Sequence, residues 1–177
     1  MIDGSRALAG IGCHTMAVMR DPSKTNSISH MGGEGALWLG QFPFTDEKHV
    51  FANMGDGTYF HSGMMAIRAA VAAKATMTYK LLHNGFVSMT GGQAHDGEVS
   101  PEQMVAQLTA EGVKRIALVS DKPEKFEGKN LGLFVTIHPR TELELVQKQM
   151  RDVEGVSVII YDQPCATERR RQRKRGK

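Results

Sequence analysis

The sequence predicts an α/β domain with a mostly parallel sheet and helices on both of its faces. Short apolar runs rich in β-branched residues alternate with segments of helical pattern, which is typical of β–α–β units. The 177 residues are enough to bury one sizeable core, and the 19 glycines suit tight turns between strands and helices. With 41% hydrophobic and 23% charged residues, the composition is that of an ordinary globular protein.

The N-terminal third shows the weakest pattern. Leu8 to Ile11 is predicted to form a short strand that ends at the turn Gly12-Cys13-His14. The run from Met31 to Ala36 predicts a turn that leads into a short helix before Phe42. Glu34 in this turn is expected to be an exposed surface carboxylate, and the alternative is that it orients a ligand site through water.

The middle of the chain predicts a β–α–β unit followed by a further helix. Val50 to Met54 and Met77 to Leu82 are extended apolar runs, and they flank the Ala-rich helical segment Gly63 to Ala75. The run Ser100-Pro101-Glu102-Gln103 combines an N-cap residue, a proline and an acidic residue in the first turn. It therefore predicts a helix that runs to about Ala110.

The last part of the chain predicts three strands and one helix. The strands are Arg115 to Val119, Leu131 to His138 and Val156 to Tyr161, and residues 123–130 are expected to form a charged loop. Thr141 is expected to cap a helix that runs to Val153.

Positive charge gathers at the C-terminus. The chain carries a net charge of +3, but residues 168–177 contain seven Arg or Lys and one Glu, so residues 1–167 are net acidic. We therefore expect residues 1–167 to form the domain and residues 168–177 to be a basic tail or linker that is solvated and disordered. The alternative is that the tail binds an acidic partner or nucleic acid, and the lack of aromatic side chains for stacking argues against this alternative.

Two absences indicate the cellular setting. No apolar run reaches the ~18 residues that a membrane helix needs, and the N-terminus lacks a signal-peptide pattern. Cys13 and Cys165 lie near opposite ends of the chain and form no disulfide framework of the secreted kind. We therefore expect a cytoplasmic protein that does not enter a membrane, and its abrupt start suggests a piece of something larger.

The most informative motif is Gly55-Asp56-Gly57, which ends one predicted strand and opens a helix. Asn84 ends the next predicted strand, and the carboxyl ends of parallel strands meet at the same edge of a sheet. The Asp56 carboxylate and the Asn84 amide supply oxygen ligands of the kind that Mg²⁺ prefers, and the backbone carbonyl of Phe86 adds a third. A helix N-terminus flanked by glycines suits a diphosphate. Gly-Asp-Gly alone is also a common turn, and it is the added Asn84 that favours a metal and diphosphate site.

These residues resemble a known family. Gly55-Asp56-Gly57 followed by Asn84 resembles the thiamine diphosphate-binding motif of thiamine-dependent enzymes. The segments GDGTYFHSGMMAIRAAVAAKA and LLHNGFVSMTGGQ are similar to the 2-oxoacid:ferredoxin oxidoreductases, most closely to the indolepyruvate ferredoxin oxidoreductases. GIGCHTM, MGGEG and DQPCATERRRQRKRG extend the resemblance from about Gly4 through the tail.

The resemblance implies a thiamine diphosphate-binding fold in which Asp56, Asn84 and the carbonyl of Phe86 hold Mg²⁺ against the diphosphate. It also implies a turn beside the cofactor, made of Thr90, Gly91, Gly92 and Gln93. In the family the cofactor adds to the 2-oxo carbon, carbon dioxide leaves, electrons pass through iron–sulfur clusters to ferredoxin, and coenzyme A takes the acyl group. The implied substrate is an aryl 2-oxoacid, and the implied partners are coenzyme A and ferredoxin.

Four further residues are candidates through the resemblance. Cys13 and Cys165 correspond to two of the four thiolates around a [4Fe–4S] cluster in the related enzymes, and the alternative is that both are ordinary buried side chains. Because the chain has no C-x-x-C pair, such a cluster would need a partner segment. His14 and His61 are candidates to bond a phosphate or the substrate carboxylate, with a structural role as the alternative.

The chain lacks several parts of a complete thiamine enzyme. The carboxylate that faces the aminopyrimidine ring comes from a separate domain in such enzymes, and nothing here is long enough to be that domain. We therefore expect a cofactor-binding domain or subunit that needs a pyrimidine-binding domain on another segment or chain. Two alternatives stay open, which are a domain of another thiamine-dependent decarboxylase or synthase and a non-catalytic interaction module with a basic tail.

Overall fold

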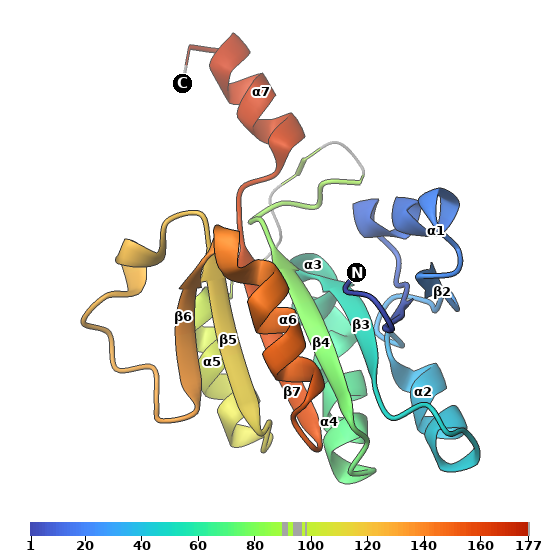
Figure 1. The fold of residues 1–177 in the computed structure, drawn as a ribbon. Helices are drawn as coiled ribbons and strands as arrows, with labels where there is room; N and C mark the ends of the chain where they lie inside the picture. Colours follow the sequence, from blue (N-terminus) through green and yellow to red (C-terminus); the bar gives the residue numbers. More distant parts are fainter. Residues whose placement is uncertain (90–91, 94–96, 98, 177) are drawn as a thin grey trace.

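A single parallel sheet organises the computed structural model, which describes residues 1–89, 92–93, 97 and 99–176. Within these residues the strand order is β2-β1-β3-β4-β7-β5-β6, and every neighbouring pair is parallel. The strands are β1 Ala7–Leu8, β2 Thr25–Asn26, β3 Val50–Gly55, β4 Met77–His83, β5 Arg115–Ser120, β6 Val135–Pro139 and β7 Val156–Asp162. The predicted fold class is therefore confirmed (Figure 1).

Helices cover both faces of this sheet (Figure 1). The helices are α1 Met16–Arg20, α2 Ala36–Gln41, α3 Asp56–Thr58, α4 Met64–Ala72, α5 Pro101–Ala110, α6 Leu143–Arg151 and α7 Ala166–Lys174. Helices α2, α4 and α5 bury their apolar side chains on one face of the sheet, and α6 buries its own on the other. Among the helices of the described residues, none is both long and apolar enough to cross a bilayer.

Short helical turns complete the connections. The 3₁₀ turns are Cys13–Thr15, Phe42–Phe44, Pro123–Phe126 and Arg140–Glu142, and a π-helical turn, Tyr59–Gly63, joins α3 to α4. The helical backbone therefore continues from Asp56 to Ala72, further toward the N-terminus than the predicted start at Gly63.

The direction of the connections changes between β1 and β3. From β1 the chain passes to β2 at one edge of the sheet, whereas from β3 it passes through α4 to β4 on the other side. In open parallel sheets, ligands bind beyond the carboxyl ends of the strands at such a reversal. The fold therefore predicts a binding crevice beyond the ends of β1 and β3.

Helix α5 begins as its sequence predicts. The Ser100 hydroxyl accepts the N–H of Gln103, and the Gln103 side chain accepts the N–H of Ser100. This reciprocal cap, with Pro101 in the first turn, satisfies donors that a helix N-terminus would otherwise leave without partners.

Some predicted boundaries were wrong. Helix α6 begins at Leu143 with Glu142 at its N-cap rather than Thr141, because a 3₁₀ turn intervenes after Pro139. Strand β6 starts at Val135 and not at Leu131, and the loop at 123–130 contains a 3₁₀ turn. Strands β1 and β2 contain two residues each, which is too short to show a period in the sequence.

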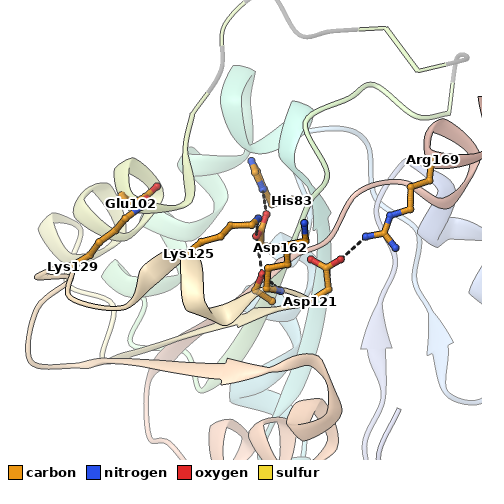
Figure 2. Close-up of polar contacts among 9 residues, drawn as sticks. His83, Glu102, Asp121, Lys125, Lys129, Asp162 and Arg169 are labelled. Atoms are coloured by element: carbon orange, nitrogen blue, oxygen red, sulfur yellow. Dashed lines mark hydrogen bonds and ion pairs between the residues drawn. The ribbon is translucent and has the colours of Figure 1, made fainter. Parts of the chain in front are cut away.

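The basic tail is helical, whereas the sequence suggested a disordered end. Helix α7 stands beyond the carboxyl edge of the sheet (Figure 1). The Arg169 guanidinium pairs with the carboxylate of Asp121, which directly follows β5 (Figure 2). This ion pair attaches the helix to the edge of the sheet, a long-range contact that the tail's composition alone does not reveal.

Candidate functional site

A cavity of about 350 Å³ opens at the carboxyl edge of the sheet, beyond the ends of β1, β3 and β4. It therefore lies at the reversal of the connections, where the fold predicts a crevice. Its lining is mostly apolar and includes Ile11, Met31, Phe60, Phe86, Val87 and Met89.

Asp56 joins the turn after β3 to the turn after β4. Its side chain is buried; Oδ2 accepts the backbone N–H groups of Asn84 at 2.7 Å and Gly85 at 2.8 Å, and Oδ1 accepts that of Gly57 at 2.9 Å. Because these donors bind both oxygens, the carboxylate has a fixed orientation at the start of the helical segment. The two strand ends on which the sequence placed a carboxylate and an amide are therefore held together.

Asn84 and Phe86 present their oxygens within one turn. The Asn84 Oδ1 atom accepts the Phe86 N–H at 3.1 Å and the Ser88 hydroxyl at 2.9 Å, and the same hydroxyl lies 3.5 Å from the Phe86 carbonyl oxygen. Asp56, Asn84 and Phe86 all line the cavity. Sequence reasoning missed Ser88, for which the only signal was a hydroxyl four residues after Asn84.

These donors suit a hard divalent cation. A carboxylate, an amide oxygen and a backbone carbonyl are oxygen ligands of the kind that Mg²⁺ takes, together with phosphate and water. Within the part of the chain that the structure describes, no group of three or more His, Cys, Asp or Glu side chains could hold a metal ion. A Cβ built on Gly55 would meet no atom within 4 Å, so the space over the turn is open to a ligand.

The π-helical turn brings two further residues to the cavity. Phe60 and His61 both lie in this turn and both line the cavity. The turn ends at Gly63, where a Cβ would lie 2.3 Å from the Met54 sulfur, so glycine allows the helix to approach β3 closely. A π turn inside an α-helix often marks a functional site.

The two candidate histidines both line the cavity but differ in their surroundings. His14 is half-buried, and its buried Nε2 atom has no hydrogen-bond partner among the described residues. Burial lowers the pKa of His14, so a neutral ring with one nitrogen available to a ligand is expected at neutral pH. His61 is exposed, and its Nδ1 atom lies 2.6 Å from the Ser62 hydroxyl.

The two cysteines are free thiols near this region. Cys13 is exposed and lines the cavity, whereas Cys165 directly precedes α7 and is half-buried. Burial raises the pKa of the Cys165 thiol, but hydrogen bonds from the backbone of Glu168, the Ser88 hydroxyl and Thr167 outweigh it, and the pKa is lowered. Cys165 therefore lies near the Ser88 hydroxyl, which binds Asn84.

The predicted turn beside the cofactor is only partly described. Thr90 and Gly91 lie outside the described residues. Gln93 pairs with Val87 in an antiparallel bridge, and a Cβ on Gly92 would face side chains of α7 at 3.0–3.1 Å. Neither Gly92 nor Gln93 is among the described residues that line the cavity.

A buried carboxylate outside the cavity binds together the ends of β4, β5 and β7 (Figure 2). Asp162 Oδ1 lies 2.8 Å from His83 Nδ1, and its Oδ2 accepts the Ser120 hydroxyl and the Lys125 ammonium, each at 2.9 Å. Burial raises the pKa of Asp162, but hydrogen bonds from these three side chains outweigh it and hold the pKa well below its ordinary value. Because His83 directly precedes Asn84, this network supports the turn that carries the proposed ligand. No sequence motif indicated this network.

Comparison with known proteins identifies related domains. The family model described as "Thiamine pyrophosphate enzyme, C-terminal TPP binding domain" matches residues 10–161. Indolepyruvate oxidoreductase subunit IorA of Pyrococcus horikoshii is 26% identical over 181 residues, which cover 94% of this chain and 26% of that protein. The protein of the same name from Methanothermobacter thermautotrophicus is 25% identical, over 88% of this chain and 24% of that one. The chain therefore spans about a quarter of the length of these relatives.

A solved structure supports the same fold. The 2-oxoglutarate:ferredoxin oxidoreductase from Magnetococcus marinus superposes with a TM-score of 0.69 at 22% identity, over 94% of this chain and 57% of that chain. At this identity the likeness shows the fold. The curated relatives confirm the resemblance to indolepyruvate oxidoreductases that the motifs predicted.

Proposed function

The chain belongs to the family of C-terminal TPP-binding domains of thiamine pyrophosphate enzymes, and on this premise we propose that it binds thiamine diphosphate and Mg²⁺ in an indolepyruvate-type 2-oxoacid oxidoreductase. One observation carries the proposal. Asp56 binds the backbone of Asn84 and Gly85, and so joins two strand-end turns at the cavity. The names of the curated relatives support the choice of reaction and of an aryl 2-oxoacid as the substrate.

Each residue at the cavity has a role in this proposal. The Asp56 carboxylate, the Asn84 amide oxygen and the Phe86 carbonyl would hold Mg²⁺ against the diphosphate. When bound, thiamine diphosphate supplies the carbon nucleophile for the 2-oxo carbon. His14 Nε2 would donate to or accept from the substrate, and the apolar side chains around the cavity would exclude water from it.

The whole enzyme is proposed to need further parts. A pyrimidine-binding domain on another segment or chain would face the aminopyrimidine ring, and coenzyme A and ferredoxin would accept the acyl group and the electrons. Cys13 and Cys165 would bind a [4Fe–4S] cluster only with thiolates from a partner segment. The cytoplasmic location and the division into residues 1–167 and 168–177 stay predictions.

Calorimetry of thiamine diphosphate binding, with and without Mg²⁺, tests the central claim. Asp56→Ala and Asn84→Ala are each expected to weaken Mg²⁺-dependent binding by at least about tenfold. Asn84→Ala is the cleaner variant, because it removes the amide oxygen and keeps the backbone N–H that binds Asp56.

Asp21→Ala is the matched control. The Asp21 side chain also accepts backbone N–H groups in a turn, those of Ser23 and Lys24, but it does not line the cavity. Its loss should leave binding unchanged. If Asn84→Ala folds with wild-type thermal stability and binds the cofactor with the same Mg²⁺ dependence as the wild type, the proposed site is wrong.

A further inference from the structure

Glu34 is a fully buried carboxyl group beside the cavity, and the sequence-based expectation of an exposed carboxylate was wrong. Its exposed fraction is 0%, although it lies in a glycine-rich turn just before α2. Gly35 follows with a φ of 82°, which places the chain in the left-handed region as the helix begins. The side chain lies against the loop after β1, a contact that the local sequence pattern does not indicate.

One carboxyl group holds two segments of the cavity lining together. Glu34 Oε2 accepts the Gly32 N–H at 2.7 Å, and a Cβ built on Gly10 would lie 2.3 Å from the Glu34 Cγ atom, so the side chain also packs against the loop after β1. Ile11 and Met31, which come from these two segments, both line the cavity. The carboxyl group therefore connects the loop after β1 to the turn before α2.

Among the described residues, the second carboxyl oxygen of Glu34, Oε1, lacks the hydrogen bond that Oε2 receives. Oε1 is buried and has no hydrogen-bond partner among the residues that the structure describes. A Cβ built on Gly10 would lie 2.8 Å from Oε1 and 2.9 Å from the carbonyl oxygen of Asn53, so both oxygens face the same small space. A carbonyl and an ionised carboxylate can only accept hydrogen bonds, whereas a protonated carboxyl group can donate one. A proton on Oε1 removes this conflict.

The surroundings favour the neutral form. Burial raises the pKa of Glu34. The backbone N–H groups near the carboxyl group and the charge of His30 lower it, but burial is the larger effect and the pKa stays raised. The Tyr79 side chain on β4 lies close to Gly35, the residue after Glu34. Burial, together with the charge of Glu34, raises the pKa of the Tyr79 phenol. Neither the Tyr79 phenol nor the His30 imidazole is a permanent cation that would stabilise an ionised carboxylate.

We propose that Glu34 is a positioning residue that, in its protonated form, holds the β1 side of the cofactor cavity, with Oε2 accepting the Gly32 N–H and Oε1 donating to the Asn53 carbonyl. Ionisation replaces that donation with repulsion between two acceptors and loosens the segments that carry Ile11 and Met31. The link to cofactor affinity rests on the proposed function, whereas the protonation state does not.

The sign of the pH effect follows from the raised pKa. The unfolded chain ionises near the ordinary pKa of Glu, about 4.3, while the folded chain keeps its proton to higher pH. Stability is therefore lost as pH rises from that value toward the folded pKa, and it is lost no further above it. Glu34→Gln keeps an acceptor and a donor in the same shape but does not titrate, so it should remove this dependence.

Two measurements on the full chain test the proposal. Urea unfolding without cofactor, from about pH 4.5 to about pH 9.5, compares the wild type with Glu34→Gln, Glu34→Ala and the exposed control Glu154→Gln. The stability of Glu34→Gln relative to the wild type is expected to grow with pH, while that of Glu154→Gln stays level. A pH-independent difference between Glu34→Gln and the wild type overturns the proposal.

Calorimetry of thiamine diphosphate with Mg²⁺ over the same pH range provides the second readout. Because the cofactor's own titration affects every variant equally, the ratio of affinities is compared at each pH. Glu34→Gln should bind like the wild type at low pH and more tightly at high pH. Glu34→Ala should be weaker by about tenfold, since it leaves the Gly32 N–H without a partner and opens a gap beside the loop after β1. Equal losses in Gln and Ala overturn the proposal. If no protein binds the cofactor, the proposed function fails, and the unfolding series still decides the protonation state.

Discussion

Replacing Asp162 with Asn tests whether the network at the ends of β4, β5 and β7 supports the edge of the sheet. Asp162 is nearly buried, with 9% of its side chain exposed, and it accepts hydrogen bonds from His83, Ser120 and Lys125. Asn keeps the shape and one acceptor, but its NH₂ group must face either His83 or the pair Ser120 and Lys125. The substitution therefore breaks part of the network without creating a cavity.

The size of the effect follows from the exposure of each partner. The Lys125 side chain is 44% exposed, so loss of its ion pair should cost less than about 1 kcal/mol. A hydrogen bond to a buried charged group contributes about 1.5–3 kcal/mol, and Asn retains part of one such bond. We expect Asp162→Asn to lower the free energy of unfolding by about 2–3 kcal/mol in total. For a chain of this length, that corresponds to a fall in Tm of about 4–12 °C.

Urea unfolding at neutral pH, with calorimetric scans, measures this effect. The matched control is Glu144→Gln, which removes a carboxylate from an exposed pair with Lys148, where the two side chains are 72% and 53% exposed. The control should change stability by no more than about 0.5 kcal/mol. Since the folded pKa of Asp162 is depressed, the wild type should also lose its advantage over Asp162→Asn as pH falls below about 3.9. Equal effects of the two substitutions at neutral pH would refute the reasoning.

Two further predictions concern other titrating groups. Burial lowers the pKa of His49 to about 4, so the unfolded chain binds the proton first, and stability should fall by up to about 3 kcal/mol between about pH 6.5 and pH 4. His49→Gln should abolish that slope in urea unfolding, and a slope of wild-type size in the variant contradicts the assignment. The pKa of Cys165 is lowered, so its alkylation by iodoacetamide should have a midpoint below that of an ordinary cysteine thiol. Thr167→Val, which removes one hydrogen bond to the sulfur, should raise that midpoint as followed by mass spectrometry. An unchanged midpoint in the variant would rule out this contact.

Elements with a local signal were predictable from the sequence. Strands β3, β4, β5 and β7 were placed to within one residue, because each is a short, mostly apolar run that contains β-branched or aromatic residues. The start of α5 was equally clear from the cap at Ser100. The tail was not predictable, because the pairing of Arg169 with Asp121 depends on where the sheet places the end of β5.

Part of the candidate site was also predictable from the sequence, and part was not. Asp56 and Asn84 each follow a strand directly, so the parallel topology alone brings them to one edge. Their hydrogen-bond geometry could not be predicted, since Asp56 binds the backbone N–H of Asn84 rather than its side chain. Glu34 was placed on the surface because glycines surround it, and its burial arises only when the loop after β1 closes over the turn.

Three buried carboxyl groups at or near this edge differ in the donors that surround them and in their access to the cavity, and the second difference determines where a cation can bind. Buried charge is tolerated where hydrogen-bond donors or cations compensate it. Asp56 has backbone N–H groups on both oxygens, and Asp162 is already occupied by His83, Ser120 and Lys125, whereas Glu34 has one oxygen without a donor among the described residues. Of the three, only Asp56 lines the cavity. A divalent cation entering the cavity should therefore bind at the Asp56 turn, and Glu34→Gln should leave the Mg²⁺ dependence of cofactor binding intact while Asp56→Ala removes it.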